Sequence, residues 1–229
     1  MNSESIGLVL FTKNEERSLG DLIDEVLHYF SKKNIFVIDG HSEDNSVLVA
    51  KQRGVSVIFD DRQGKGSAIQ VALKHIERDI LIFMDSDGSH RPQELPLLLE
   101  PLLKDQSIAM VIGSRFKGKS DELRGSFHEL LRLFANYAGT LLVNFIFQVK
   151  LTDIQNGFRA VRTEVIRSLL LSEKSFAIEQ EMVIRCLKKR MKIVEIPSWE
   201  LRRRFDVSHV IPRKMFYRYV SSFIKNVVC

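Results

Sequence analysis

The stretch "LIFMDSDGSH" (81–90) holds four apolar residues, followed by two aspartates that are one residue apart. A short apolar run of this kind is typical of a strand that is buried on both faces of a sheet. Asp85 and Asp87 follow the point where that strand should end. Because a loop is no longer pleated, two carboxylates at this spacing can both face one hard cation, such as Mg²⁺ or Mn²⁺. The simpler alternative is an ordinary turn with two solvated aspartates, and the surrounding sequence must decide between them.

The first half of the chain alternates apolar runs of strand length with helical patterns. Strands are expected at 6–12, 34–39, 55–60, 79–85 and 108–114, and helices near 16–30, 43–53, 66–78 and 92–104. This alternation predicts an α/β fold with a mostly parallel, doubly wound central sheet flanked by helices. In such sheets, ligands bind beyond the carboxyl ends of the strands.

Polar side chains gather at those expected carboxyl ends. The segments are "TKNE" (12–15), "DGHSED" (39–44), "DDRQGKG" (60–66), "DSDGSH" (85–90) and "GSRF" (113–116). Lys65 stands between two glycines at the start of an expected helix, where the helix N-terminus favours anions, and Arg115 ends the next strand. A carboxylate pair with basic groups at the same edge suits a diphosphate that is bridged by a divalent metal.

The second half of the chain is organised differently. We expect a loop rich in Lys, Gly and Ser at 117–126, a long amphipathic helix at 127–149, helices near 163–171 and 179–190, and a strand at 192–197. Residues 213–228 form a further amphipathic pattern, in which Lys214, Arg218 and Lys225 lie opposite the apolar side. The longest apolar run, 138–149, is shorter than the roughly 18–20 residues that span a bilayer. The last helix is therefore expected either to pack on the body or to lie in a membrane interface.

Composition and charge exclude several classes of protein. The 229 residues are 45% hydrophobic and 28% charged, which fits neither a disordered chain nor a membrane bundle. Residues 185–229 carry twelve Lys and Arg against three acids, whereas residues 1–184 sum to a charge of −4. This basic end suggests an anionic partner: a phosphate, a nucleic acid or a membrane surface. Two cysteines without C-x-x-C spacing and an N-terminus without a signal pattern favour the cytoplasm.

The order of short motifs along the chain carries a resemblance. The motifs are "FTKNEE", "VIDGHSEDNS", "GKGSAIQVAL", "MDSDGSH", "VIGSRF", "TDIQNGFRAV", "EQEMVIRC" and "VEIPSWELRRRFDVSH". Together they resemble glycosyltransferase family 2, and within it the dolichyl-phosphate and polyprenyl-phosphate mannose or glucose synthases. The match runs from about residue 6 to residue 210.

The resemblance implies a GT-A fold in a single domain over residues 1–210. The amphipathic pattern adds a C-terminal helix at 211–229. The resemblance further implies a metal-dependent inverting transfer of a hexose from a GDP- or UDP-linked donor to a polyprenyl or dolichyl phosphate. The cofactor would be Mg²⁺ or Mn²⁺. The partners would include a membrane surface and no nucleic acid, and the protein would sit at the cytoplasmic face of that membrane.

The resemblance also assigns roles to individual residues. The base and ribose would be surrounded by Phe11, Lys13, Glu15, Val37 and Asp39. The diphosphate would be met by Asp85, Ser86, Asp87 and Ser89, of which Asp85, Asp87 and Ser89 would hold the metal. Arg115 would lie near the sugar-phosphate, and Arg203 and His209 would close over the phosphates. The catalytic residues would be Asp87, Arg115 and Asp153.

Four alternatives for the reaction and the protein class stay open. An acceptor phosphate is largely ionised at neutral pH, because its second pKa is about 6, and it needs no strong general base. A family 2 enzyme that acts on a saccharide or other hydroxyl would need such a base, for which Asp153, Glu179 and Glu181 are the candidates. A nucleotidyltransferase also uses metal-binding aspartates on an α/β sheet. A basic binding module without catalysis would not explain the carboxylate pair.

Overall fold

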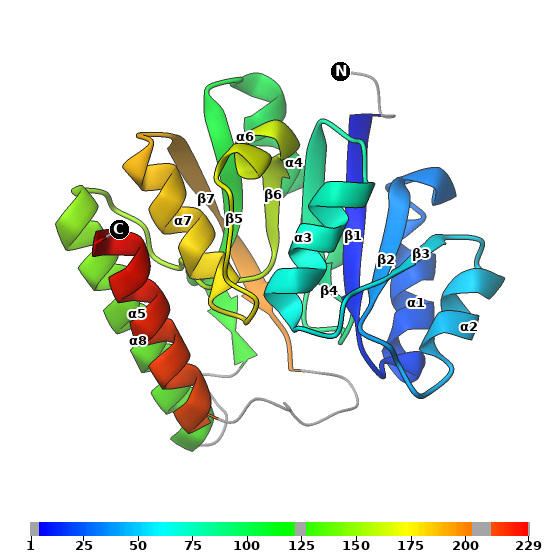
Figure 1. Ribbon diagram of the computed structural model, residues 1–229. Helices are drawn as coiled ribbons and strands as arrows, with labels where there is room; N and C mark the ends of the chain where they lie inside the picture. Colours follow the sequence, from blue (N-terminus) through cyan, green and yellow to red (C-terminus); the bar gives the residue numbers. More distant parts are fainter. Residues whose placement is uncertain (1–4, 122–126, 203–211, 229) are drawn as a thin grey trace.

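Seven strands form one central sheet in the computed structural model, which describes residues 5–121, 127–202 and 212–228 (Figure 1). The strands are β1 (Ile6–Thr12), β2 (Ile35–Asp39), β3 (Ser56–Phe59), β4 (Ile80–Asp85), β5 (Ile108–Ser120), β6 (Arg159–Arg162) and β7 (Lys192–Glu200). Their order across the sheet is β3-β2-β1-β4-β6-β5-β7. All neighbouring pairs are parallel except those of β6, which runs antiparallel to both β4 and β5. The expected α/β fold with a mostly parallel sheet is confirmed.

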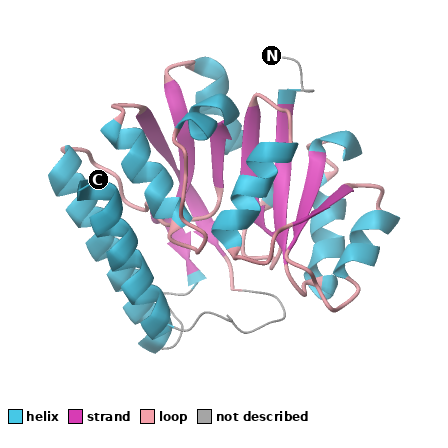
Figure 2. Ribbon diagram, in the orientation of Figure 1, coloured by secondary structure: helices cyan, strands magenta, loops and turns pink. Residues whose placement is uncertain are grey.

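Helices cover both faces of this sheet, as Figure 2 shows. One face is covered by α1 (Glu16–Val26), α2 (Ser46–Gln52) and α4 (Leu95–Lys104). The other face is covered by α3 (Lys65–His75), α6 (Thr163–Ser168) and α7 (Ile178–Lys188). Short 3₁₀ turns at Lys32–Asn34 and Pro92–Glu94 precede β2 and α4.

The alternation of side chains along each strand produces two cores. On β1, Val9 and Phe11 pack in the core on the α3–α7 side, whereas Leu8 and Leu10 pack in the core on the α1–α4 side. Every residue of β1 is buried, as are Ile80 to Met84 on β4. This burial explains why these strands read as continuous apolar runs in the sequence.

The structure corrects two expectations about the second half. Residues 117–120 were expected in a loop, but they extend β5, which pairs with the end of β7 at Lys119–Trp199 and Ser120–Glu200. No strand was expected at 159–162, where β6 inserts between β4 and β5. The four residues of β6 begin and end with arginine, and these guanidinium groups bond to backbone carbonyls such as Glu179 O and Ile108 O. With arginine at both ends, only two apolar residues remain in β6, which is too few to predict a strand from the sequence.

Two long helices, α5 (Phe127–Phe147) and α8 (Pro212–Val228), lie side by side at one edge of the molecule (Figure 1). The side chain of Gln180 on α7 donates a hydrogen bond of 3.1 Å to Tyr219 O, and Arg185 Nε donates one of 3.0 Å to Asn226 Oδ1. One side of α8 therefore packs on the body of the protein. Within the described residues, no helix is both long and apolar enough to cross a membrane.

Candidate functional site

A pocket of about 450 Å³ opens at the carboxyl ends of β1, β2 and β4. It is lined by Phe11, Thr12, Lys13, Glu15, Ile38, Gly40, Asp60, Arg62, Gln63, Gly64, Lys65, Ala68, Asp85, Ser86, Asp87 and Phe176. Six of the residues expected to bind substrate are in this lining: Phe11, Lys13, Glu15, Asp85, Ser86 and Asp87. The edge of the sheet on which the sequence concentrates polar groups is therefore the edge that carries this pocket.

The backbone around Asp85 is held by contacts with β1 and α1. Phe11 pairs with Asp85 in the parallel register of β1 and β4. Beyond that pair, the Ser86 backbone N–H and hydroxyl both donate to Phe11 O, at 3.1 and 2.8 Å, and Ser18 Oγ donates to Ser86 O at 2.7 Å. These bonds orient the D-x-D turn toward the pocket rather than toward bulk solvent.

Asp85 does not stand alone in the pocket, because the ammonium group of Lys65 contacts it directly. Lys65 Nζ lies 2.7 Å from Asp85 Oδ1, 2.8 Å from Asp85 Oδ2 and 3.1 Å from Glu179 Oε1. Burial alone would lower the pKa of Lys65, but the two carboxylates outweigh it and raise that pKa above its ordinary value. Burial alone would raise the pKa of Asp85, but Lys65 and His90 outweigh it and hold that pKa well below its ordinary value. Both groups are therefore charged at neutral pH.

Two glycines allow this cluster to assemble. A Cβ at Gly66 would overlap with the carbonyl oxygen of Glu173, and a Cβ at Gly157 would lie 2.6 Å from Lys65 Nζ and 3.2 Å from Asp85 Oδ2. Gly66 lets the loop at 172–175 pack on the start of α3, and Gly157 lets the "NGFR" turn cover the ion pair. At Gly66 the neighbouring atoms belong to the backbone and leave no space for a Cβ, whereas at Gly157 a Cβ would have to displace the ends of the Lys65 and Asp85 side chains.

Asp87 is 6% exposed, and its Oδ1 atom accepts hydrogen bonds from Ser89 N at 2.9 Å and Ser89 Oγ at 2.6 Å. Ser89 itself does not line the pocket, so its described contacts are those of a residue that orients Asp87. Among the described residues, no three His, Cys, Asp or Glu side chains form a group that could hold a metal by themselves. Mg²⁺ and Mn²⁺ are commonly held by one or two carboxylates together with substrate phosphates, and Asp85 and Asp87 in one pocket fit that donor set.

Arg115 and Asp153 form a second buried cluster outside the pocket lining. Arg115 Nε lies 2.6 Å from Asp153 Oδ2, and Arg115 Nη2 lies 2.9 Å from Asp153 Oδ1. Arg115 Nη1 also lies 3.4 Å from Glu200 Oε1. The backbone N–H of Asp153 donates to Glu195 Oε1 at 2.7 Å, which ties its loop to β7. The structure thus brings these two expected catalytic residues together, as partners in a bidentate ion pair.

The remaining expected site residues lie deeper or elsewhere. Val37 is fully buried in the core on the α1–α4 side, and its neighbours Ile38 and Gly40 line the pocket instead. Asp39 is also fully buried and accepts hydrogen bonds from Ser42 N and Ser42 Oγ, at 2.9 and 2.6 Å. Arg203 and His209 lie outside the described residues, so their expected role stays a prediction.

Several pocket residues were not named by the sequence reasoning. Arg62 and Phe176 line the pocket. Glu179, which the sequence suggested only as a candidate base, lies outside the lining and forms an ion pair with Lys65. Lys65 between two glycines was the one sequence signal for this region, and it pointed to an anion rather than to Asp85. Glu181, a candidate base, instead accepts the backbone N–H groups of Ser172 and Glu173, at 3.1 and 2.8 Å.

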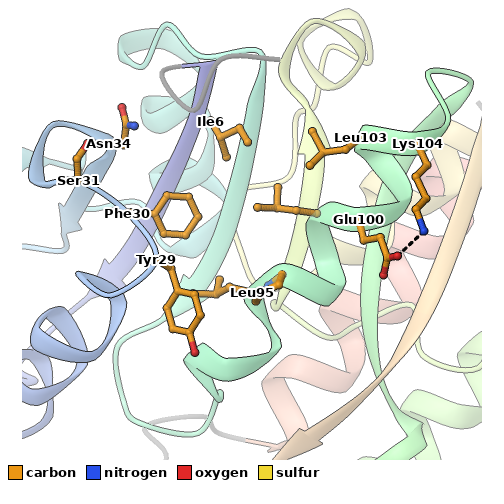
Figure 3. Close-up of a pocket in the computed structure, with 11 residues that line it drawn as sticks. Ile6, Tyr29, Phe30, Ser31, Asn34, Leu95, Glu100, Leu103 and Lys104 are labelled. Atoms are coloured by element: carbon orange, nitrogen blue, oxygen red, sulfur yellow. Dashed lines mark hydrogen bonds and ion pairs between the residues drawn. The ribbon is translucent and has the colours of Figure 1, made fainter.

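A second pocket, of about 530 Å³, lies beside the amino end of β1 (Figure 3). Its walls are mainly apolar and include Ile6, Tyr29, Phe30, Leu95 and Leu103. Its charged pair, Glu100 and Lys104, is one turn apart on the exposed side of α4. Although this pocket is larger, the carboxylates and basic groups of the D-x-D edge do not line it.

A sequence model of glycosyl transferase family 2 matches residues 8–170, which is more than half of the chain. The chain belongs to glycosyl transferase family 2. The family expected from the motif order is therefore confirmed. The matched region includes the D-x-D turn, the Lys65 loop and the "NGFR" turn of this family 2 chain.

Two curated relatives of the family 2 chain are named for lipid-phosphate substrates, and a third is named only as a glycosyltransferase. The chain is 29% identical over 214 residues to the undecaprenyl-phosphate mannosyltransferase of Micrococcus luteus, covering 87% of this chain and 85% of that protein. It is 30% identical over 203 residues to the dolichol-phosphate mannosyltransferase of Pyrococcus furiosus, covering 84% of this chain and 55% of that protein. It is also 28% identical over 200 residues to glycosyltransferase AglJ of Haloferax volcanii, of which it spans 62%.

Solved structures share the fold of the family 2 chain. Glucosyl-3-phosphoglycerate synthase from Mycobacterium tuberculosis, solved in complex with Mn²⁺, UDP-glucose and glycerol 3-phosphate, matches with a TM-score of 0.76 at 20% identity. The match covers 98% of this chain and 80% of that chain. The expected GT-A fold is confirmed by this likeness.

Proposed function

We propose that the protein transfers a hexose from a nucleotide-diphospho-sugar to a polyprenyl or dolichyl phosphate, with inversion at the anomeric carbon and with Mg²⁺ or Mn²⁺ as cofactor. The observation that carries this proposal is the pocket at the carboxyl ends of the strands. There, two carboxylates that suit a hard cation lie with basic side chains and with the aromatic rings of Phe11 and Phe176. Relatives named as lipid-phosphate mannosyltransferases and a neighbour solved with Mn²⁺ and UDP-glucose support the same reaction class.

The donor would bind along this pocket from β1 to β4. Phe11, Lys13 and Glu15 line the part that would hold the base and ribose, above the buried Val37 and Asp39. Asp85, Ser86 and Asp87 line the part that would hold the diphosphate. A bound divalent cation would neutralise negative charge on the departing nucleoside diphosphate. Ser89 orients Asp87 for this role through its two hydrogen bonds.

Arg115 would add positive charge near the sugar-phosphate, with Asp153 holding the guanidinium group in place. Both oxygens of Asp153 accept from Arg115, and Arg115 is 7% exposed. A buried bidentate pair of this kind keeps one orientation of the guanidinium plane. Asp153 is therefore proposed as a positioning residue for Arg115.

The contacts made by the three candidate bases favour a phosphate acceptor over a hydroxyl acceptor. Asp153 is paired with Arg115, Glu179 shares the ammonium group of Lys65, and Glu181 holds the backbone of the loop at 172–175. A hydroxyl acceptor needs a carboxylate that can take its proton, whereas an ionised phosphate does not. Attack by the acceptor phosphate on the face opposite the leaving diphosphate inverts the anomeric centre.

The surface formed by α5 and α8 suits a peripheral membrane contact near the acceptor. This α5–α8 surface consists of exposed apolar side chains at Phe134, Tyr137, Leu141, Leu142, Phe145, Ile146, Tyr217, Val220 and Ile224. Phe145 is 77% exposed, and Arg218 and Lys225 on α8 are also exposed. Exposed apolar side chains next to basic ones are typical of segments that rest in the interface of an anionic membrane.

A thermal-shift panel tests the donor and metal parts of this proposal. GDP-mannose, UDP-glucose and UDP-N-acetylglucosamine are each added with and without Mn²⁺. We expect one donor to raise the melting temperature strongly with Mn²⁺ and weakly without it. A ligand that binds the folded protein but not the unfolded chain stabilises the folded state by its binding free energy. Asp87→Asn should lose the Mn²⁺-dependent shift, whereas Asp24→Asn on the exposed face of α1 should keep it. A lack of response to every donor would contradict the proposal.

A further inference from the structure

The ammonium group of Lys65 occupies the carboxylate oxygens that a metal on Asp85 would need. Nζ lies within 2.8 Å of both Asp85 oxygens, and the Lys65 side chain is only 10% exposed. A divalent cation bound to the same carboxylate would lie within a few ångströms of this ammonium group. Like charges so placed repel each other strongly. A metal can therefore bind Asp85 only if Lys65 gives up at least one of the two oxygens that it now contacts.

Glu179 offers Lys65 a second position within the same cluster. Its Oε1 atom already lies 3.1 Å from Nζ, and Glu179 is 2% exposed. Its Oε2 atom is buried and accepts no hydrogen bond from any side chain or backbone group of the described residues. A buried carboxylate oxygen without a donor costs free energy, so an arriving ammonium group would be stabilised there.

The surroundings limit Lys65 to a short movement between these two carboxylates. Gly157 covers the ion pair so closely that an added Cβ would lie 2.6 Å from Nζ. The centroids of the Phe11 and Phe176 rings lie 5.9 and 5.6 Å from Nζ, where their faces attract a cation. The ammonium group thus lies among a turn, two rings and two carboxylates, and Glu179 is an acceptor that it already contacts.

We infer that Lys65 is a competing cation for the metal site, and that it passes from Asp85 to Glu179 when the metal binds with the nucleoside diphosphate. The inference rests on the metal-dependent function proposed above and adds a positioning pair, Lys65 and Glu179, to it. The exchange conserves charge pairing, because Glu179 takes the ammonium group while Asp85 takes the metal. It also makes the metal bind weakly until a diphosphate supplies further negative charge, so metal and nucleotide bind cooperatively.

Mn²⁺ titration of nucleotide-free protein, followed by electron paramagnetic resonance of the free ion, tests this inference without measuring activity. Lys65→Met should bind Mn²⁺ on the order of tenfold more tightly than the unaltered chain, because the competing charge is gone. Glu179→Gln should bind it several-fold more weakly, because Lys65 loses its second position. Lys74→Met, an exposed lysine on the same helix, should leave the affinity unchanged.

The double variant Lys65→Met/Glu179→Gln distinguishes movement of Lys65 to Glu179 from a direct attraction between the Glu179 charge and the metal. We expect Glu179→Gln to weaken Mn²⁺ binding much less when Lys65 is already absent, which is the signature of coupling between the two residues. Equal weakening in both backgrounds would overturn the inference, as would equal Mn²⁺ affinity of Lys65→Met and the unaltered chain. If neither UDP nor GDP induces Mn²⁺ binding to any form, the metal dependence of the proposed function fails as well.

A structure of the unaltered chain with Mn²⁺ and UDP or GDP tests the same point without a substitution that could impair folding. We expect Nζ of Lys65 to lie within hydrogen-bond distance of both Glu179 oxygens and to have left at least one Asp85 oxygen to the metal. Nζ still bonded to both Asp85 oxygens beside a bound Mn²⁺ would overturn the inference.

Discussion

At the scale of single residues, Gly157 lies directly against the charged cluster of Lys65, Asp85 and Glu179. A Cβ at this position would lie 2.6 Å from Lys65 Nζ, so Gly157→Ala must displace the ammonium group or the turn. We expect donor affinity or kcat/KM to fall by about ten- to a hundredfold, since small displacements at a site have effects of this size.

Gly139 on α5 provides a matched control for Gly157. A Cβ there would meet its nearest neighbours at 3.6 and 3.7 Å, which is ordinary contact. Gly139→Ala should keep donor affinity and leave the melting temperature equal or slightly higher, because alanine restricts the unfolded chain. Unchanged donor affinity in Gly157→Ala would contradict the described packing over Lys65.

Arg115 and Asp153 give a prediction about stability. Arg115→Met leaves the carboxylate of Asp153, 1% exposed, without its cation, which should lower the free energy of unfolding by about 3–5 kcal/mol. Arg53→Met breaks an ion pair whose Asp24 side chain is 57% exposed, and it should cost at most about 1 kcal/mol. Urea denaturation measures both, and Arg115→Met/Asp153→Asn should cost less than the sum of its single changes. Equal costs for the two arginine variants would be inconsistent with a buried pair.

Sequence reasoning located Asp85 and Asp87 because two rules converge on them. A continuous apolar run identifies a buried strand, and parallel strands bring their carboxyl ends to one edge. It did not locate the contact between Lys65 and Asp85, which are 20 residues apart and meet only once α3 packs on the sheet. It named Arg115 and Asp153 separately but not as a pair, since no periodic pattern reports a contact between side chains 38 residues apart.

At the scale of elements, the loop at 172–175 connects α7 to the Lys65 turn. Glu181 accepts the backbone N–H groups of Ser172 and Glu173, and Lys174 O accepts the N–H of Gly66 at 3.0 Å. Glu181→Gln removes charge-assisted acceptors from this loop, which should cost about 1–3 kcal/mol of local stability.

Hydrogen exchange followed by mass spectrometry measures this effect. The backbone amides of residues 172–175 should exchange faster in Glu181→Gln, and those at the start of α3 should follow, because the loop packs on them. Glu164→Gln on the exposed side of α6 should leave exchange in both segments unchanged. Unaltered exchange in Glu181→Gln would show that the loop is held by other contacts.

Strand β6 shows where element prediction from sequence stops. The long apolar strands and the amphipathic helices follow from period-two and period-3.6 patterns. β6 has four residues, and its arginines are stabilised by carbonyls of distant segments, so no local pattern identifies it. The continuation of β5 through "KGKS" (117–120) was not predicted for the same reason. Its residues are polar, and they form a strand because they pair with the end of β7.

At the scale of the whole molecule, the α5–α8 surface predicts where a membrane would contact the protein. Phe145→Asp places a charge at a side chain that is 77% exposed, so the fold should be unaffected. Recovery of the protein with anionic phospholipid vesicles in flotation should fall about tenfold, because burying one large apolar side chain contributes roughly 1.5–3 kcal/mol. Leu48→Asp on α2, at a side chain that is 52% exposed, should float like the unaltered chain. Equal flotation of both variants would show that the α5–α8 surface is not the membrane contact.

The acceptor class is the central claim for the molecule as a whole, and one transfer measurement tests it most directly. The protein is incubated with Mn²⁺, a radiolabelled donor, vesicles that contain polyprenyl phosphate, and free saccharide acceptors. We predict that label enters the organic phase as a sugar joined to polyprenyl phosphate with inverted anomeric configuration, and that Asp87→Asn abolishes this transfer. Label found only on saccharide hydroxyl groups, with none on the lipid phosphate, would contradict the account.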